Sequence, residues 1–234
     1  MTTLLDKLTG ALVVSCQAEP GLPLDRPDHI AALAASAVLG GATAVRIQGA
    51  PNIRAVRAAV AVPVIGLVKV VRPGTDVYIT PTFDDIDAVV EAGAHIVAFD
   101  ATDRLRPVDV PALVARVRAW NRLSMADVST VAEGRAAYAA GADVVGTTMA
   151  GYTPTTRNDG GPDFTLMIEL ARAGVPFVAE GRVRTPEEAA RCLELGARFV
   201  VVGGAITRPD VITRRFADHI KVAAPRPAAR EVHQ

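Results

Sequence analysis

The sequence repeats one pattern eight times: a short apolar run followed by a longer amphipathic stretch. Apolar runs rich in β-branched residues are typical of buried parallel strands, and apolar residues three and four positions apart are typical of helices. The predicted strands are 12–15, 44–47, 64–68, 96–99, 123–126, 144–147, 177–179 and 199–202. The predicted helices are 27–39, 53–60, 83–91, 110–120, 130–139, 164–172, 186–195 and 211–222. This alternation predicts an α/β fold in which helices connect parallel strands.

Eight such units in 234 residues favour one closed (β/α)8 barrel, a TIM barrel. An open doubly wound sheet is the alternative, but the GxGxxG turn typical of that fold does not follow the first predicted strand. We therefore expect a single barrel domain over residues 1–222. The segment 223–234 is rich in proline and alanine and has no apolar periodicity, so a flexible tail is expected there.

The charge balance excludes several classes of partner. Lys and Arg number 25, as do Asp and Glu, so there is no electrostatic reason to expect binding to nucleic acid or to an anionic membrane. No apolar run approaches the roughly 20 residues of a membrane span, and the first residues do not resemble a signal peptide. Cys16 and Cys192 form no CxxC pair, and the four histidines lack metal-ligand spacing. We expect a cytoplasmic protein with no metal and no cofactor.

Polar residues follow almost every predicted strand. In a TIM barrel the catalytic groups lie at these C-terminal strand ends and in the loops after them. The residues at these positions are Cys16, Gln17, Arg46, Lys69, Asp100, Asp127, Thr147, Thr148, Glu180, Gly203 and Gly204. One polar residue at a strand end can simply mark where the strand meets solvent. Because all eight strands would point such groups toward one mouth, the set predicts an active site.

Lys69 and Glu180 are the candidates for catalysis. Lys69 is one of only three lysines among 25 basic residues, and lysine loses its proton far more readily than arginine when it is desolvated. It therefore suits proton transfer or Schiff-base formation. Glu180 would face it across the barrel, either in a structural ion pair or as a group that orients the lysine and shares protons. Arg46 and Asp127 either bind substrate hydroxyls or pair with each other.

The eighth strand is followed by the strongest signal for an anion site. Gly203 and Gly204 expose backbone N–H groups before a predicted helix, and Arg208 can add a charge-assisted contact. Gly181 and Arg182 lie in the loop after the seventh strand. The loops after strands seven and eight form the usual phosphate site of TIM barrels, so a phosphorylated substrate is expected.

The segment 148–163 is the longest one without periodicity. It follows the sixth strand, is rich in Thr, Gly, Asn and Asp, and carries Tyr152. A loop of this length in a barrel is more often a functional lid than a plain connection. We expect it to cover the mouth.

The sequence resembles the family of bacterial N-acetylmannosamine-6-phosphate 2-epimerases, enzymes of amino-sugar and sialic-acid catabolism. The resemblance extends from about residue 15 to residue 220. It rests on ordered blocks that include SCQ (15–17), PVIGLVK (63–69), TDVYITPT (75–82), MADVST (125–130), GTTMAGYT (146–153), AEGR (179–182) and VGGAITRP (202–209).

The resemblance implies an isomerase that interconverts N-acetylmannosamine 6-phosphate and N-acetylglucosamine 6-phosphate by proton removal and return at C2, without metal or nucleotide. It implies that Lys69 is the catalytic acid/base and that Glu180 is its partner. The residues that would hold the sugar are Gln17, Arg46, Asp127, Thr148 and Tyr152. Those that would hold the phosphate are Gly181, Arg182, Gly203, Gly204 and Arg208.

Two other functions are compatible with the same barrel. One is a different phosphosugar isomerase, or an aldolase in which Lys69 forms a Schiff base with the substrate. The other is a catalytically silent barrel that only binds phosphosugars, which the presence of both Lys69 and Glu180 disfavours. The apolar share of the sequence also suggests that a second copy covers some faces, as in a homodimer.

Overall fold

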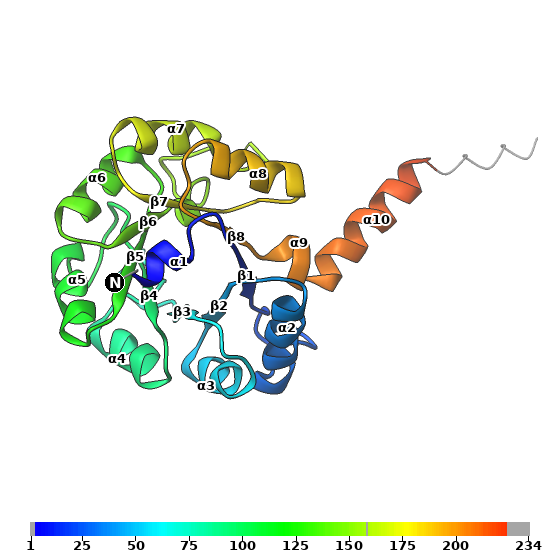
Figure 1. Ribbon diagram of the computed structural model, residues 1–234. Helices are drawn as coiled ribbons and strands as arrows, with labels where there is room; N and C mark the ends of the chain where they lie inside the picture. The colour runs from blue at the N-terminus through cyan, green and yellow to red at the C-terminus, as the bar shows by residue number, and fades with distance from the viewer. Residues whose placement is uncertain (1–2, 158, 224–234) are drawn as a thin grey trace, which may run out of the picture.

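Eight parallel strands close into a barrel in a computed structural model that describes residues 3–157 and 159–223. Each strand pairs with the next in the sequence, and β8 pairs with β1, which rules out the open sheet (Figure 1). The strands are β1 (Leu12–Cys16), β2 (Ala44–Gln48), β3 (Val64–Leu67), β4 (Ile96–Asp100), β5 (Leu123–Asp127), β6 (Val144–Gly146), β7 (Phe177–Glu180) and β8 (Val200–Val202). All eight predicted strands are confirmed, with ends that differ by one residue.

Helices follow the strands, and all of them except the last form the outer wall of the barrel (Figure 1). They are α2 (Pro27–Leu39), α3 (Ala50–Ala59), α4 (Phe83–Glu91), α5 (Val110–Ala119), α6 (Val131–Ala139), α7 (Phe164–Arg172), α8 (Pro186–Glu194) and α10 (Pro209–Ala223). The predicted bounds of α2, α4 and α7 are confirmed. Helix α3 begins three residues earlier than predicted, because Pro51 occupies its first turn, where a missing N–H costs nothing.

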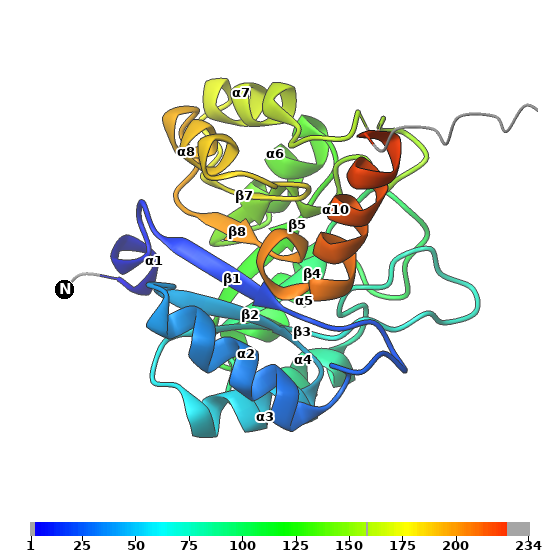
Figure 2. The ribbon, with the colours of Figure 1, turned by 90° about the vertical axis from the view of Figure 1, so that its right-hand side faces the viewer.

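Three short helical segments were not predicted: α1 (Leu4–Lys7), η1 (Thr147–Met149) and α9 (Gly204–Thr207). Each is too short to show helical periodicity in the sequence. Helix α1 lies at the end of the barrel where the strands begin, opposite the long loops (Figure 2). Its Leu5 and the following Leu8 are buried in the apolar cluster that fills the barrel, so this end is closed.

Alternation along the strands divides the core into two layers. Successive side chains of a strand point to opposite faces. One set fills the barrel interior, and the other packs between strands and helices. Gly66 shows how closely the outer layer packs, since a Cβ there would lie 2.7 Å from Ala94 Cβ and from Val89 Cγ1.

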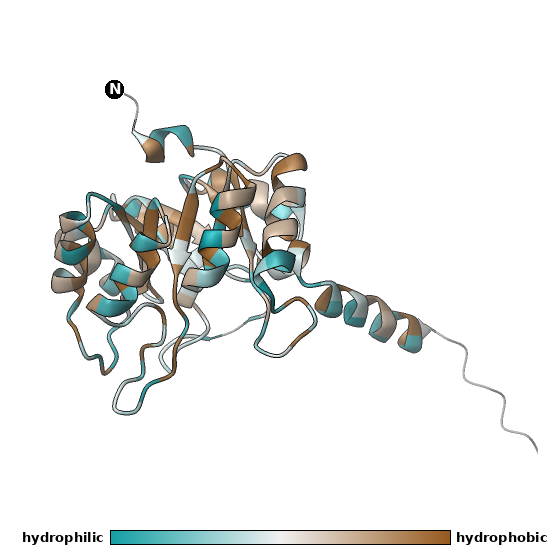
Figure 3. Ribbon diagram, turned by 90° about the horizontal axis from the view of Figure 1, so that it is seen from below, coloured by the Kyte–Doolittle hydropathy of each residue, from teal (hydrophilic) through white to brown (hydrophobic). Residues whose placement is uncertain are grey.

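Helix α10 departs from the pattern of the other helices. It runs away from the barrel instead of lying along it (Figures 1 and 3). Phe216, Ile220 and Val222 on this helix are 68%, 65% and 87% exposed. The predicted tail spans 223–234; Ala223 is the last residue of α10, and residues 224–234 lie outside the described residues. Among the described helices, none is long and apolar enough to cross a membrane.

Candidate active site

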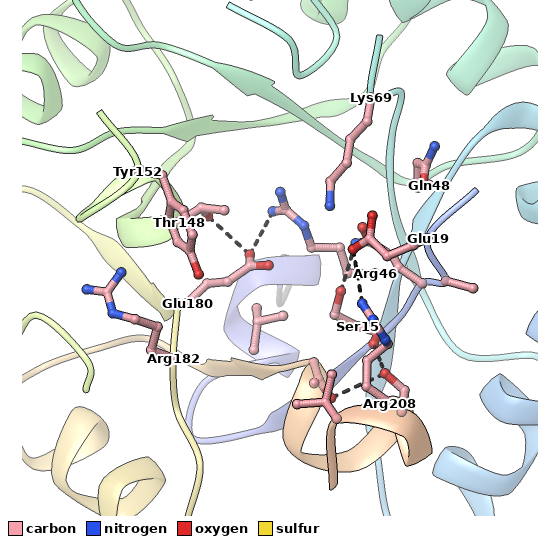
Figure 4. Close-up of a pocket in the computed structure, with 18 of the residues that line it drawn as sticks. Ser15, Glu19, Arg46, Gln48, Lys69, Thr148, Tyr152, Glu180, Arg182 and Arg208 are labelled. Atoms are coloured by element: carbon pink, nitrogen blue, oxygen red, sulfur yellow. Dashed lines mark hydrogen bonds and ion pairs between the residues drawn. The ribbon is translucent and has the colours of Figure 1, made fainter. Parts of the chain in front are cut away.

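A cavity of about 850 Å³ opens where the strands end (Figure 4). It gathers side chains from loops and strands all around the barrel. The predicted site residues that line it are Gln17, Arg46, Lys69, Thr148, Tyr152, Glu180, Gly181, Arg182, Gly203, Gly204 and Arg208. Asp127 lies beneath the floor, fully buried.

The period of two along each strand sets the floor of this cavity. Val13, Ala44, Met125, Val178 and Val201 belong to the apolar cluster inside the barrel. Two positions further along their strands stand polar residues or glycine: Ser15, Arg46, Asp127, Glu180 and Gly203. The apolar filling of the barrel therefore ends in a polar layer that faces the cavity.

Arg46 holds two carboxylates at the centre of this layer. Its Nη2 lies 2.6 Å from Asp127 Oδ2, and its Nη1 lies 2.9 Å from Glu180 Oε2. The arginine is 1% exposed and Asp127 is fully buried. The sequence left open whether Arg46 and Asp127 bind substrate hydroxyls or pair with each other, and in the structure they form an ion pair. Arg46 still lines the cavity, and no described residue accepts a hydrogen bond from its buried Nε.

The segment after β6 adds a hydroxyl to the same group. Thr148 Oγ1 lies 2.7 Å from Asp127 Oδ1 and 3.1 Å from Glu180 Oε2, so it can donate to either carboxylate. Thr147 Oγ1 donates to the carbonyl of Glu180 and accepts from its N–H, which fixes the backbone of that residue. A Cβ on Gly146 would lie 2.7 Å from Asp127 Oδ1, so glycine makes room for the carboxylate.

Glu180 is the one carboxyl of this group that combines burial with access to the cavity. Burial raises its pKa to about 7; the Arg46 guanidinium opposes this rise and the nearby Asp127 adds to it. The carboxyl can therefore gain and lose a proton near neutral pH, a property common in catalytic groups.

Lys69 lies two residues beyond β3, and an antiparallel ribbon fixes its backbone. The N–H of Val70 donates to the carbonyl of Tyr78, and the N–H of Thr80 donates to the carbonyl of Val68. Lys69 itself pairs with Ile79. Thr80 is buried with a φ of 45°, and its hydroxyl donates to the carbonyl of Ala98.

The Lys69 amine points into the cavity toward the Arg46–Glu180 pair (Figure 4). It makes no ion pair or hydrogen bond with any residue in 3–157 or 159–223. The side chain is open to solvent in the cavity, yet barrel atoms surround it. This desolvation and the charge of Arg46 lower the pKa of Lys69, while Glu180 and Glu19 oppose the shift.

The opposite side of the cavity is basic and is built from loops. Gly203 precedes α9, and Gly204 and Ala205 open it, so their N–H groups have no acceptor within the helix. Thr207 Oγ1 donates to the carbonyl of Ser15, which attaches α9 to β1. Four arginines line the cavity here: Arg182, Arg184, Arg208 and Arg215.

The loop 150–163 is attached to the barrel through Arg182. Its guanidinium donates to the carbonyls of Ala150 and Gly161, at the two ends of the loop. It also lies 5.4 Å from the centre of the Tyr152 ring, in cation–π contact. Tyr152 is half-exposed above the cavity. In this structure Arg182 anchors the loop, and its role toward a phosphate stays a prediction.

Among the cavity-lining residues that sequence reasoning missed are Tyr78 and Glu19. Tyr78 places its hydroxyl 3.6 Å from Met149 Sδ, and Arg104 lies 5.8 Å from its ring. Glu19 contacts Arg208 from the loop after β1. Both lie outside predicted strands, so strand-end position gave no signal. Asp100, at the end of β4, lies outside the cavity lining and pairs with Arg104.

The part of the chain that the structure describes contains no cluster of metal ligands. No three His, Cys, Asp or Glu side chains come together there in a way that would hold an ion. At the cavity, the carboxylates of Asp127, Glu180 and Glu19 pair with arginines instead.

The chain is similar to known proteins in both sequence and structure. A family described as "Putative N-acetylmannosamine-6-phosphate epimerase" matches residues 30–222. A Salmonella arizonae protein described as a "Putative N-acetylmannosamine-6-phosphate 2-epimerase" is 48% identical over 217 residues, covering 92% of this chain and 94% of the relative. The solved structure of the N-acetylmannosamine-6-phosphate 2-epimerase from Clostridium perfringens superposes with a TM-score of 0.90 at 41% identity, covering 93% of this chain and 96% of that one. Thiamine phosphate pyrophosphorylase from Pyrococcus furiosus shares only the fold, with a TM-score of 0.57 at 20% identity, covering 93% of this chain and 99% of that one.

Proposed function

The chain belongs to the N-acetylmannosamine-6-phosphate epimerase family, and from this premise we propose that it interconverts N-acetylmannosamine 6-phosphate and N-acetylglucosamine 6-phosphate. The two sugars differ only in configuration at C2. In the open-chain form the C2 proton lies next to the C1 aldehyde, so its removal gives an enolate. Return of a proton to the opposite face of C2 completes the epimerisation. The protein serves amino-sugar and sialic-acid catabolism.

The observation that carries this proposal is the unpaired amine of Lys69 in the cavity. A lysine with a lowered pKa is neutral in a larger fraction of molecules and can accept a proton from carbon. Because no described residue holds the Nζ by an ion pair or hydrogen bond, it is free to approach a substrate. Lys69 removes the C2 proton in this mechanism.

Glu180 is the partner of Lys69. Its pKa near 7 allows it to carry a proton in one half of the reaction and release it in the other, or to orient the protonated lysine. Arg46 and Thr148 contact it and set its position. The Arg46 Nε and the Gln17 Oε1 are buried without a hydrogen-bond partner among the described residues, which supports roles in holding the sugar or its developing negative charge.

The substrate phosphate binds at the basic side of the cavity. Its ligands are Gly181 and Arg182, after β7, and Gly203, Gly204 and Arg208, after β8. The open N–H groups at the start of α9 support this assignment. This site is remote from C2, so its binding energy can hold the sugar in a reactive arrangement. The unphosphorylated sugar is therefore expected to lose kcat as well as affinity.

Incubation with N-acetylmannosamine 6-phosphate in D₂O, followed by proton NMR, tests the activity. We expect N-acetylglucosamine 6-phosphate with deuterium at C2. Folded protein that produces neither epimer nor exchange would exclude the proposal and leave a binding protein. Borohydride added during turnover separates direct proton transfer from a Schiff base, because only the Schiff base gives a reduced adduct on Lys69.

We also propose that the protein is a cytoplasmic homodimer. The exposed apolar residues Phe216 and Ile220 lie four positions apart, on one face of α10, and α10 leaves the barrel wall. A second copy of the chain would cover this face. Both cysteines are free and buried, which suits a reducing compartment. Light scattering is expected to give the mass of a dimer, and Phe216→Asp to give that of a monomer.

A further inference from the structure

Arg208 forms ion pairs with two carboxylates, those of Glu19 and Asp210. Its Nε and Nη2 donate to Asp210 Oδ1 and Oδ2 at 2.9 and 2.8 Å, and its Nη1 donates to Glu19 Oε1 at 3.0 Å. Figure 4 shows Glu19 reaching Arg208 beside Ser15. One guanidinium with two carboxylates has a net charge of minus one. The cation assigned to the phosphate is thus already neutralised.

A phosphate that joins this group is repelled by the two carboxylates. A sugar phosphate carries a charge of about −1.5 to −2 at neutral pH. Two like charges 4 Å apart repel by about 1 kcal/mol in water and about 4 kcal/mol at the effective dielectric constant of a protein surface. Three of the five N–H groups of the guanidinium already donate to carboxylates. Departure of one carboxylate frees a donor and removes part of this repulsion, so it favours direct contact of the phosphate with Arg208.

Glu19 is the carboxylate that can leave. Asp210 is two residues from Arg208, in the first turn of α10, and binds it through two oxygens. Glu19 comes from the loop between β1 and α2, binds through a single oxygen, and its side chain is 64% exposed. Rotation of this side chain into solvent costs one surface ion pair, which is a small free energy.

We propose that Glu19 is a competing anion that occupies Arg208 in the empty site and is displaced by the phosphate of the substrate. This inference rests on the phosphate assignment of the proposed function. Displacement adds the same penalty to every phosphate that binds Arg208. The sugar phosphate has further contacts to offset the penalty, whereas inorganic phosphate has few. Glu19 therefore weakens occupancy of the site by inorganic phosphate while the substrate still binds.

Two matched variants, Glu19→Gln and Asp210→Asn, test the proposal because each removes one negative charge next to Arg208. The inhibition constant of inorganic phosphate and the KM for N-acetylmannosamine 6-phosphate are measured for both. Glu19→Gln is expected to lower the inhibition constant by about three- to tenfold and the KM in the same direction. Asp210→Asn is expected to lower both constants less, since the loss of its charge is offset by the loss of the two contacts that orient the guanidinium. An unchanged or raised inhibition constant in Glu19→Gln, or an equal decrease in both variants, would overturn the proposal.

Variants of Arg208 separate this proposal from the one on which it rests. In an Arg208→Gln background, Glu19→Gln is expected to have no further effect on the inhibition constant, because the competition needs the guanidinium. An effect that persists there would also overturn the role of Glu19. If Arg208→Gln alone leaves the KM and inhibition constant unchanged in folded protein, the phosphate assignment itself is wrong. Circular dichroism of each variant establishes that it is folded.

Discussion

The two sides of the cavity are built in opposite ways. On the side of Lys69, the charged groups stand on strands or directly after them, and Arg46 is 1% exposed between its two carboxylates. On the side of Arg208, the groups stand on loops and helix starts, and Glu19 is largely exposed. Buried charges in contact hold one another in a fixed geometry, whereas exposed pairs exchange partners at little cost.

This difference matches the demands on each side. Proton transfer at carbon requires a base and its partner in fixed positions, because a small displacement lowers the rate strongly. On the proposed assignment, a phosphate enters and leaves the Arg208 side in every turnover, so this side benefits from groups that can be exchanged. The comparison predicts that the side of the cavity that would perform the chemistry is its more rigid half.

The largest effect is expected from Lys69. Lys69→Met and Lys69→Arg are both expected to lower kcat by about 10²- to 10⁴-fold, the usual contribution of a general acid or base. The arginine variant keeps the positive charge but cannot act as a base. Deuterium exchange at C2, followed by NMR, measures the loss. Lys7→Met on the exposed surface of α1 is the control. Substantial activity in Lys69→Arg would mean that charge alone suffices at this position.

The next effect concerns stability and compares the two sides directly. Arg46→Met leaves Asp127 and Glu180 buried without their cation, and is expected to lower the free energy of unfolding by about 3 to 5 kcal/mol. Arg208→Met removes ion pairs to the more exposed Glu19 and Asp210, and is expected to cost about 1 kcal/mol or less. Urea denaturation of both variants gives the values. Equal losses would refute the contrast between the two sides.

The order of strands and helices could be predicted from sequence, because burial leaves a pattern of apolar residues in each of them. Strands are short apolar runs, and helices have apolar residues three and four positions apart. The same logic located Lys69 and Glu180, since both follow apolar strands and barrel closure brings all strand ends to one mouth. Whether Arg46 pairs with Asp127 could not be decided, because the two residues are 81 positions apart and only the register of the closed barrel joins them.

Other features of the structure leave no periodic pattern of apolar residues in the sequence. The ribbon that fixes Lys69 consists of a few residues on each side of a turn, and it depends on a φ of 45° at Thr80. Glu19 meets Arg208 across 189 positions, between two loops. The amphipathic pattern of α10 predicts a helix, but the same pattern suits a helix on the barrel and one that leaves it.

Glu180 is expected to make stability depend on pH. Its pKa is about 7 in the folded protein, against an ordinary value of 4.5. Between these two values the folded state holds a proton that the unfolded state has released, so stability falls as pH rises from 4.5 to 7 and then levels off. A shift of this size corresponds to about 3 kcal/mol at most. The slope is measured as the difference between the wild type and Glu180→Gln, which stays neutral. A difference that does not change with pH would refute the raised pKa.

Arg182 is expected to have a smaller effect, on binding. Arg182→Gln removes the contacts to Ala150 and Gly161 that attach the loop, and is expected to raise KM by about tenfold, the effect of about 1.4 kcal/mol. Hydrogen exchange of the amides in residues 150–157 is expected to become faster, which distinguishes loosening of the loop from loss of a phosphate contact. Arg172→Gln on the exposed surface of α7 is the control. A higher KM with unchanged exchange would favour direct contact of Arg182 with phosphate.

The smallest effect is expected at the border between strand and loop, where Cys16 and Glu19 are three residues apart. Cys16 ends β1, is 0% exposed, and burial raises its pKa to about 12; burial likewise raises the pKa of Cys192 to about 11. Because the thiolate is the reactive form, iodoacetamide at pH 8 is expected to modify neither residue in the folded protein and to leave activity unchanged. In Glu19→Cys the new thiol, on the exposed loop, is expected to react within the same period. Mass spectrometry of the intact protein counts the modifications. If Cys16 reacts as fast as the thiol at position 19, the end of β1 opens as readily as the loop, and the strand side of the cavity is not the rigid half.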